Sequence, residues 1–246
     1  MTLVESGIVN PVKRIVKTTF RLCGLNIERI NPADNNYDWL LKYGIETVLD
    51  IGANTGQFAE WIRRVLPEAH IYSFEPIKKC YDKLIENMAE APNFHAFNYA
   101  LGDTETDQEM HVNAFTPSSS LLPMANLHKR NFPYTAAEHV EKVKIKRLDV
   151  VAEDLKLAGN LLIKIDVQGY EDKVIRGGQN VMSRAEVLIV ETSFKSLYVG
   201  QPMFEDVYDM LKQIGFRYIG ALEQLSSPLD GSVLQADSIF IKNVEN

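Results

Sequence analysis

The sequence predicts an α/β fold: a doubly wound, seven-stranded and mostly parallel sheet with antiparallel strands at its C-terminal edge. From residue 47 onward, short apolar runs alternate with helical patterns, which is typical of parallel strands covered on both faces. Right-handed crossovers make a doubly wound sheet the simplest topology. Near the C-terminus, strand-like segments at 216–222 and 238–242 are joined by a turn-rich link without a helix, which predicts an antiparallel pair.

The remaining elements follow in order along the chain. Strands are predicted at 47–51, 70–74, 94–101, 161–166 and 187–191, and helices at 57–66, 77–90, 170–176 and 203–214. Alternation along 161–166 places Lys164 and Asp166 on one face of a strand that is covered on both sides. Because an unpaired buried ammonium is costly, Lys164 is expected to have a carboxylate partner.

Two stretches fall outside this regular pattern. Residues 1–40 are expected to form an N-terminal helical extension in front of a domain spanning 41–246. Within that domain, residues 102–148 are too long for one loop and contain two strand-like pieces, so they predict an insertion that overhangs the ligand site.

The N-terminal extension contains an amphipathic segment at 8–22. Its apolar positions recur three or four residues apart, and basic side chains occupy the opposite face. Two interpretations stay open: a peripheral helix packed on the domain, or an interfacial helix near anionic lipid or a lipid-linked substrate.

Composition restricts the classes of partner. The 246-residue chain carries 26 Lys and Arg against 33 Asp and Glu, a net charge of −7, which argues against a nucleic-acid partner. Cys23 and Cys80 have neither disulfide-framework nor metal-ligand spacing. No apolar run approaches the roughly 18 residues of a membrane span, and no leader-like apolar stretch opens the chain. These features predict a cytoplasmic protein without a transmembrane segment.

The most informative stretch is VLDIGANTGQ at 48–57. A buried strand enters a turn containing Gly52 and Gly56 and then a helix, so the backbone can approach a ligand beside the positive end of the helix. In open α/β sheets, ligands bind at the carboxyl ends of the strands.

Three cofactor classes compete for this loop. The dinucleotide pattern G-x-G-x-x-G fails because Asn54 and Gln57 occupy two of its glycine positions, and the phosphate-loop pattern fails because no Gly-Lys-Ser/Thr follows. What is left is G-x-x-x-G preceded by Asp50, which suits a ligand with ammonium and sulfonium groups. Glu75, at the end of the next strand, can accept hydrogen bonds from both ribose hydroxyls of an adenosine.

Several motifs carry a family resemblance: VLDIGANTG (48–56), YSFEP (72–76), NYALGD (98–103), SSSLL (118–122), KIDVQGYE (164–171) and ADSIFIK (236–242). With them the sequence resembles the class I S-adenosylmethionine (SAM) methyltransferases, and more narrowly the FkbM family, over about residues 47–243. The resemblance implies a Rossmann-like sheet and SAM as methyl donor. It also implies that the strand of Lys164 lies between the first and fifth strands, which makes Asp50 and Glu191 its candidate partners.

The expected SAM contacts follow from these motifs. They are Asp50, Gly52, Asn54 and Gly56 for the methionine end, Glu75 for the ribose, and Asn98 or the Ala100 backbone for the adenine.

Methyl transfer to a hydroxyl also needs a group that takes up the proton. Asp166 ends its strand at the same cleft, and the sequence leaves it as base or acceptor ligand, cofactor contact or structural residue. Glu191 ends the fifth strand and with Asp166 could hold Mg²⁺, but Thr192 follows where a second acid would sit, so a metal is not favoured. His111 and His128, both in the 102–148 insertion, compete as the base.

The favoured function is O-methylation of a hydroxyl on a sugar, a glycan or a small-molecule metabolite; the residues alone do not choose between oxygen and nitrogen. A non-catalytic SAM-binding scaffold would keep 48–56 and Glu75 but have no acceptor pocket. An NAD-dependent sugar oxidoreductase is disfavoured by Asn54. The acceptor itself and the oligomeric state stay open.

Overall fold

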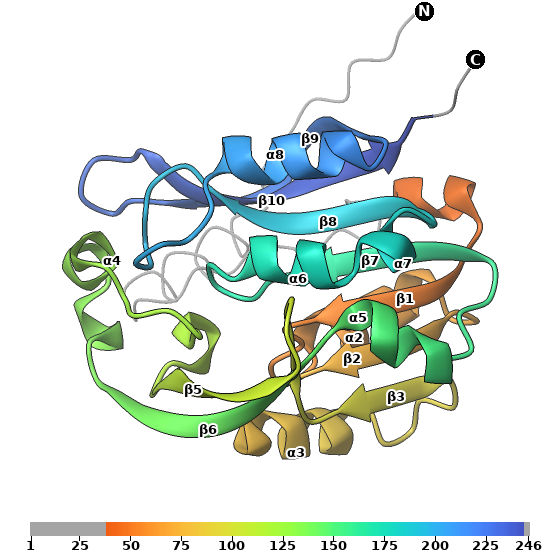
Figure 1. Ribbon diagram of the computed structural model, residues 1–246, viewed down its shortest axis with the longest axis horizontal. Coiled ribbons are helices and arrows are strands. Elements are labelled where there is room, and N and C mark those ends of the chain that lie inside the picture. The colour runs from red at the N-terminus through yellow and green to blue at the C-terminus, as the bar shows by residue number, and fades with distance from the viewer. Residues whose placement is uncertain (1–37, 244–246) are drawn as a thin grey trace, which may run out of the picture. The chain divides into compact units, whose positions relative to one another are not determined.

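The computed structural model describes residues 38–243 and contains a seven-stranded sheet in the order β3-β2-β1-β7-β8-β10-β9 (Figure 1). Its strands are β1 (Ile45–Ile51), β2 (His70–Phe74), β3 (Phe94–Phe97), β7 (Asn160–Ile165), β8 (Ala185–Ser193), β9 (Phe216–Ser226) and β10 (Val233–Lys242). The first five strands of this order pair in parallel, whereas β10 runs antiparallel to both β8 and β9. The predicted fold class is confirmed, including the antiparallel C-terminal pair.

Helices pack on both faces of the sheet. One face is covered by the 3-10 helix η1 (Asp38–Tyr43), α2 (Gln57–Val65) and α3 (Lys78–Asn87), whose apolar side chains cluster with Val48 and Leu162. The other face is covered by α5 (Leu148–Val151), α6 (Glu171–Gly177), α7 (Gln179–Met182) and α8 (Phe204–Gln213). Helices α5 and α7 were absent from the predicted set because each is a single turn, too short to show a helical period.

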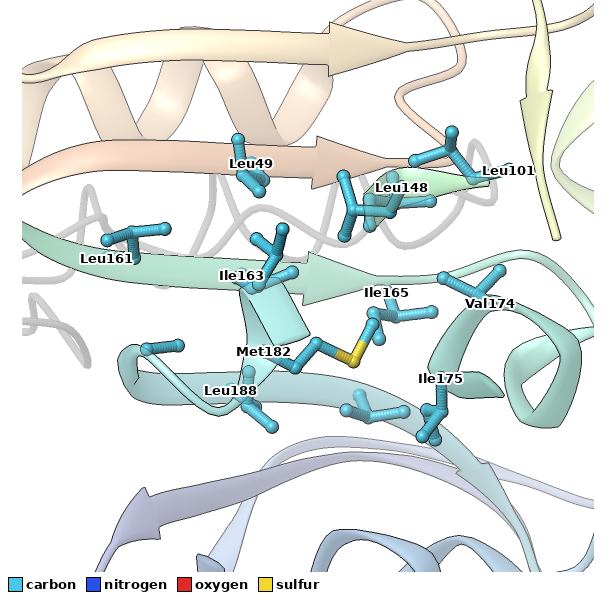
Figure 2. Close-up of a cluster of buried hydrophobic side chains, with 14 of the residues drawn as sticks. Leu49, Leu101, Leu148, Leu161, Ile163, Ile165, Val174, Ile175, Met182 and Leu188 are labelled. Atoms are coloured by element: carbon cyan, nitrogen blue, oxygen red, sulfur yellow. The ribbon is translucent and has the colours of Figure 1, made fainter. Parts of the chain in front are cut away.

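Strand alternation divides the core between these faces. Figure 2 shows Leu49, Ile163 and Leu188, from three neighbouring strands, in one apolar cluster with Ile175 and Met182. All five side chains are fully buried. The sheet core is therefore the continuous apolar surface that the near-uninterrupted hydrophobic runs predicted.

The stretch 102–148 forms a second, smaller layer. Its strands β5 (Thr106–Asn113) and β6 (Glu138–Lys146) pair antiparallel, and β6 also pairs with β4 (Ala100–Leu101). Between β5 and β6 lie η2 (Thr116–Ser118), α4 (Asn126–Asn131) and η3 (Pro133–Thr135); a further 3-10 helix, η4 (Ala152–Asp154), follows α5.

The single strand predicted at 94–101 is wrong in one respect: the chain divides it into β3 of the large sheet and β4 of the small one. The physical reason lies at Asn98, whose amide donates hydrogen bonds to the backbone carbonyls of Glu75 and Pro76, both at 2.9 Å. These bonds hold a bend between the two strands.

The prediction of a helix at 8–22 lies outside the described residues. Between residues 38 and 243, none of the helices has the length and apolar character needed to span a membrane.

Candidate active site

A cavity of about 530 Å³ opens where β1, β2, β7 and β8 end, beneath the 102–148 insertion. Of the predicted site residues, the cavity is lined by Asp50, Gly52, Asn54, Glu75, Ala100, His128, Asp166 and Glu191. The other three, Gly56, Asn98 and His111, do not belong to its lining.

The glycine turn after β1 is shaped by close contact with the loop after β7. Gly52 has φ +86°, and a Cβ there would lie 1.9 Å from the carbonyl oxygen of Asp166. The amides of Gly52 and Ala53 both donate to the carbonyl of Phe74, at 3.0 and 3.1 Å, which ties the turn to β2. No side chain fits at residue 52, so the glycine is required by the fold as well as by any ligand.

Gly56 lies outside the cavity lining and packs against α3. It has φ +98° at the start of α2, and a Cβ there would lie 2.8 Å from Cδ1 of Leu84 in α3. It therefore sets the approach of two helices and shapes the loop from behind the cavity.

Glu75 is held rigidly at the cavity wall. Its Oε2 accepts a hydrogen bond from the Asn54 amide and its Oε1 one from the Ile77 amide, both at 2.8 Å. The side chain is buried, and this burial raises its pKa to about 7 despite the two amide donors. Each carboxylate oxygen keeps a second acceptor position, so two neighbouring hydroxyls can be bound together.

Asp50 lies deeper and is incompletely satisfied. Its Oδ2 accepts a hydrogen bond from the Ser73 hydroxyl at 3.1 Å, whereas Oδ1 is buried and has no hydrogen-bond partner among residues 38–243. Burial raises its pKa to about 6, against the opposing effect of the Lys164 ammonium. An unpaired buried acceptor on a cavity wall suits a hydrogen-bond donor from a ligand.

Charged side chains form a row along the ligand edge of one sheet face. Apolar residues of the same face are Val48, Leu162, Ile189 and Ile239. On each of these strands a charged residue lies two positions away from the apolar one, and therefore on the same face. The row consists of Asp50, Lys164, Asp166, Glu191 and Asp237, and all five line the cavity. Four carboxyls around one ammonium favour a cationic ligand over an anionic one.

Lys164 is buried, as predicted, but its partner is neither Asp50 nor Glu191. Its Nζ donates to Oδ2 of Asp166 at 2.9 Å. Burial opposes the charged form, yet the carboxylates of Asp166, Asp237 and Asp50 outweigh it and hold the pKa of Lys164 above its usual value. The expected partners lie on neighbouring strands, whereas Asp166 follows Lys164 by two residues on the same face of its own strand and is in direct contact with the ammonium.

Two glutamines connect the acids at the centre of the cavity. The Gln168 amide nitrogen donates to Oδ1 of Asp166 at 2.8 Å and to Oε2 of Glu191 at 2.7 Å. The Gln235 amide donates to the same Glu191 oxygen at 2.8 Å. Burial and the neighbouring Asp166 charge raise the pKa of Glu191 well above its usual value.

Gln168 and Tyr198 were missed by sequence reasoning, although Gln168 lies within KIDVQGYE. Gln168 adopts the left-handed φ of +55°, which is uncommon for a side chain with a Cβ and directs its amide between the acids. The Tyr198 hydroxyl is 2.9 Å from Oε1 of Gln168 and 3.1 Å from the carbonyl of Ser118. The hydroxyl of Ser120 donates to the Gln168 carbonyl at 2.6 Å, which gives the SSSLL motif a physical role: it fastens the insertion to the reaction centre.

The two histidines of the insertion differ in position. His111 lies on β5, where its Nδ1 is 3.2 Å from Glu138 on β6, away from the cavity lining. His128 lies on α4, lines the cavity and is 3% exposed. The sequence could not separate them because both are polar residues in a loop-rich stretch.

The apolar end of the cavity lies beyond Glu75. Ile77, Ala100, Met110 and Leu121 line it and share one buried cluster. Met110 and Leu121 were not foreseen, because they come from the insertion and meet Ile77 only in the tertiary fold. Such a surface suits the flat face of an adenine.

The hydrogen bonds made by Asp166 and Glu191 do not favour a metal ion between these two carboxylates. Asp166 and Glu191 already accept hydrogen bonds from Lys164, Gln168 and Gln235. In the part of the chain that the structure describes, no group of three or more His, Cys, Asp or Glu side chains is arranged to hold a metal ion.

Comparison with known proteins places the chain in a family. Residues 50–218 match the family model of the methyltransferase FkbM domain. The chain is 27% identical over 179 residues to the 2-O-methyltransferase NoeI of Sinorhizobium fredii, covering 70% of this chain and 73% of NoeI. It is 27% identical over 147 residues to the hexuronic acid methyltransferase AglP of Haloferax volcanii, covering 59% of this chain and 55% of AglP.

Among solved structures, the TehB-like SAM-dependent methyltransferase of Corynebacterium glutamicum aligns with a TM-score of 0.43 and 12% identity over 95% of this chain and 100% of that one. The family match covers the glycine turn, Glu75, the Lys164–Glu171 motif and Glu191. The chain therefore belongs to the FkbM family of SAM-dependent methyltransferases.

Proposed function

We propose that this protein transfers a methyl group from SAM to a hydroxyl oxygen of a sugar or another small-molecule acceptor. The observation that carries the proposal is the continuity of one cavity. Its lining includes both Glu75 with the glycine turn and the connected acids Asp166 and Glu191. The names of two relatives, a 2-O-methyltransferase and a hexuronic acid methyltransferase, favour oxygen and a sugar.

The donor end fits SAM residue by residue. Glu75 would accept the ribose hydroxyls, the orphaned Oδ1 of Asp50 would face the methionine ammonium, and Gly52 and Asn54 would border the methionine chain. Ala100 would flank the adenine, and Asn98 would act indirectly by holding the bend beside Glu75. SAM supplies an electrophilic methyl group on a positively charged sulfur.

The acceptor end would hold the hydroxyl between Asp166 and Glu191. Both oxygens of Asp166 accept hydrogen bonds, which suits a fixed orienting group. Glu191 lines the cavity beside Asp166 and would be the proton acceptor in its ionised form, in which its raised pKa makes it a stronger base than an exposed carboxylate. As the acceptor oxygen bonds to the methyl carbon, the S–C electron pair passes to sulfur and the hydroxyl proton passes to Glu191. We do not assign a step to His111, because it pairs with Glu138 instead.

The test begins with SAM binding by calorimetry on the full chain, followed by turnover with methyl-labelled SAM and a panel of methyl glycosides. Labelled product with base-stable, ether-linked methyl groups is expected. If SAM bound but no hydroxylated acceptor gained label, the chain would instead be a non-catalytic SAM-binding module. Labelled amine products with no labelled ethers would contradict the assignment to oxygen.

A further inference from the structure

A line of aromatic rings leads from the mouth of the cavity toward the acids. Phe115 and Tyr134 pack edge to face with centroids 5.6 Å apart, and Tyr134 lies 6.2 Å from Phe132. Phe132 is 5.4 Å from His128, which is 5.3 Å from Tyr198. The line ends at the Tyr198 hydroxyl, which contacts Gln168 and through it Asp166 and Glu191.

The outer two rings of this line, Phe115 and Tyr134, are exposed to solvent. Phe115 is 47% and Tyr134 65% exposed, yet both line the cavity. Neither ring is required for the packing of the large sheet, since neither belongs to its buried clusters. Exposed aromatic rings that continue into a reaction cavity are typical of a binding surface.

His128 is the polar group within this line. It is nearly fully buried, and its Nδ1 has no hydrogen-bond partner in the described chain. Burial lowers its pKa to about 4, so the imidazole is neutral at physiological pH and offers one acceptor and one donor nitrogen. A neutral ring also does not repel the cationic methyl donor expected in the same cavity.

We propose that the insertion carries the acceptor subsite: the apolar face of a pyranoside ring packs against the edge-to-face pair of Phe115 and Tyr134 and stacks on one of the two rings, and His128 hydrogen-bonds one of its hydroxyls. The proposal rests on the function proposed above. A pyranoside has C–H groups on its faces and hydroxyls around its rim, so it requires an aromatic surface on one side and polar groups at its edge. The insertion provides the aromatic surface. The polar groups are His128 and the hydrogen-bonded network of Asp166, Gln168 and Glu191.

The stacking part is tested by saturation-transfer NMR on the full chain loaded with S-adenosylhomocysteine (SAH), with the neutral methyl glycosides as probes. Ring C–H protons of at least one glycoside should receive saturation from the wild-type protein. The double variant Phe115→Ala/Tyr134→Ala should lose this signal, and where turnover is measured its KM should rise about tenfold while SAH affinity stays unchanged. Leu229→Ala, which removes another exposed apolar side chain outside the cavity, is the matched control.

The His128 part is tested by turnover of the same glycoside. His128→Leu should lower kcat/KM about 10–100-fold, the effect of losing one buried hydrogen bond, and His128→Gln should recover part of it. His139→Leu is the control, because His139 is exposed and paired with Glu141.

Each outcome decides the proposal. Unchanged KM in the double variant, unchanged kcat/KM in His128→Leu, or no bound glycoside would overturn it. A parallel loss of SAH affinity would also overturn it, because the residues would then belong to the donor site or to the fold. Absence of SAM binding by the wild-type protein would instead contradict the proposed function.

Discussion

The ammonium of Lys164 donates a hydrogen bond to the carboxylate of Asp166 at 2.9 Å, from two residues earlier in the chain. The pair lies in the row of acids, where Asp50 and Asp237 also act on the ammonium. Lys164 thus supplies the positive charge within this row of acids. The first two predictions follow from this pair.

Replacement of Lys164 by Met should lower the free energy of unfolding by about 3 kcal/mol, because it leaves buried carboxyls without their cation. Chemical denaturation measures the change. Lys142→Met, which breaks the exposed pair of Lys142 with Asp107, should cost less than about 1 kcal/mol. Equal effects of the two substitutions would mean that the buried pair has no special role.

Exhaustive dialysis against EDTA should leave the initial rate unchanged. The acids that would ligate Mg²⁺ already accept hydrogen bonds from Lys164, Gln168 and Gln235. Loss of activity on dialysis, with recovery on adding Mg²⁺ alone, would show that a metal displaces these donors.

Replacement of Gly52 by Ala should destabilise the fold and abolish SAM binding, since the new Cβ would overlap the Asp166 carbonyl. Gly200→Ala provides the matched control: Gly200 also has positive φ, at +81°, but nothing lies within 4 Å of its Cβ position. Thermal unfolding should show about 1–3 kcal/mol of extra destabilisation in Gly52→Ala over that control. If the two variants unfold alike, steric contact with the β7 loop does not constrain the turn.

Replacement of Glu75 by Ala should weaken SAM binding about 10–100-fold, because the ribose hydroxyls lose a buried acceptor. Calorimetry with SAM measures the affinity, and Glu90→Ala, at an exposed position of the same chain segment, is the control. Affinity within error of the wild type would remove Glu75 from the donor site.

The stability of the cofactor-free protein should fall as pH rises from about 4.5 to 7. Burial raises the pKa of both Glu75 and Glu171 from 4.5 to about 7, so in this range the folded state binds more protons than the unfolded state. The slope of the unfolding free energy against pH is proportional to the number of protons bound by the unfolded state minus the number bound by the folded state. This difference is negative here, so the slope is negative.

Calorimetric unfolding across this range measures the slope. Glu171→Gln should flatten it, because Glu171 is buried beneath the loop after β7 and accepts the Gly169 amide at 3.0 Å. Glu90→Gln should leave it unchanged. A slope of opposite sign in the wild type would mean that hydrogen bonding, and not burial, dominates these carboxyls.

Local features of the sequence were sufficient to predict the fold class. Apolar runs and helical periods are properties of neighbouring residues, and the turn at Gly52 with Glu75 one strand later depends only on strand order. The α/β class and the antiparallel C-terminal pair agree with the structure, and Asp50, Gly52, Asn54 and Glu75 line one cavity.

The reaction centre was decided by contacts between residues far apart in the chain. Gln235 meets Glu191 through the antiparallel register of β10 on β8, across 44 residues, and Tyr198 meets Ser118 across 80. The different positions of His111 and His128 have the same origin, whereas Asp166, the partner of Lys164, is only two residues away in the chain. Local periodicity records which face a side chain occupies; which side chains meet across that face depends on register and loop path, and these are set by packing of the whole domain.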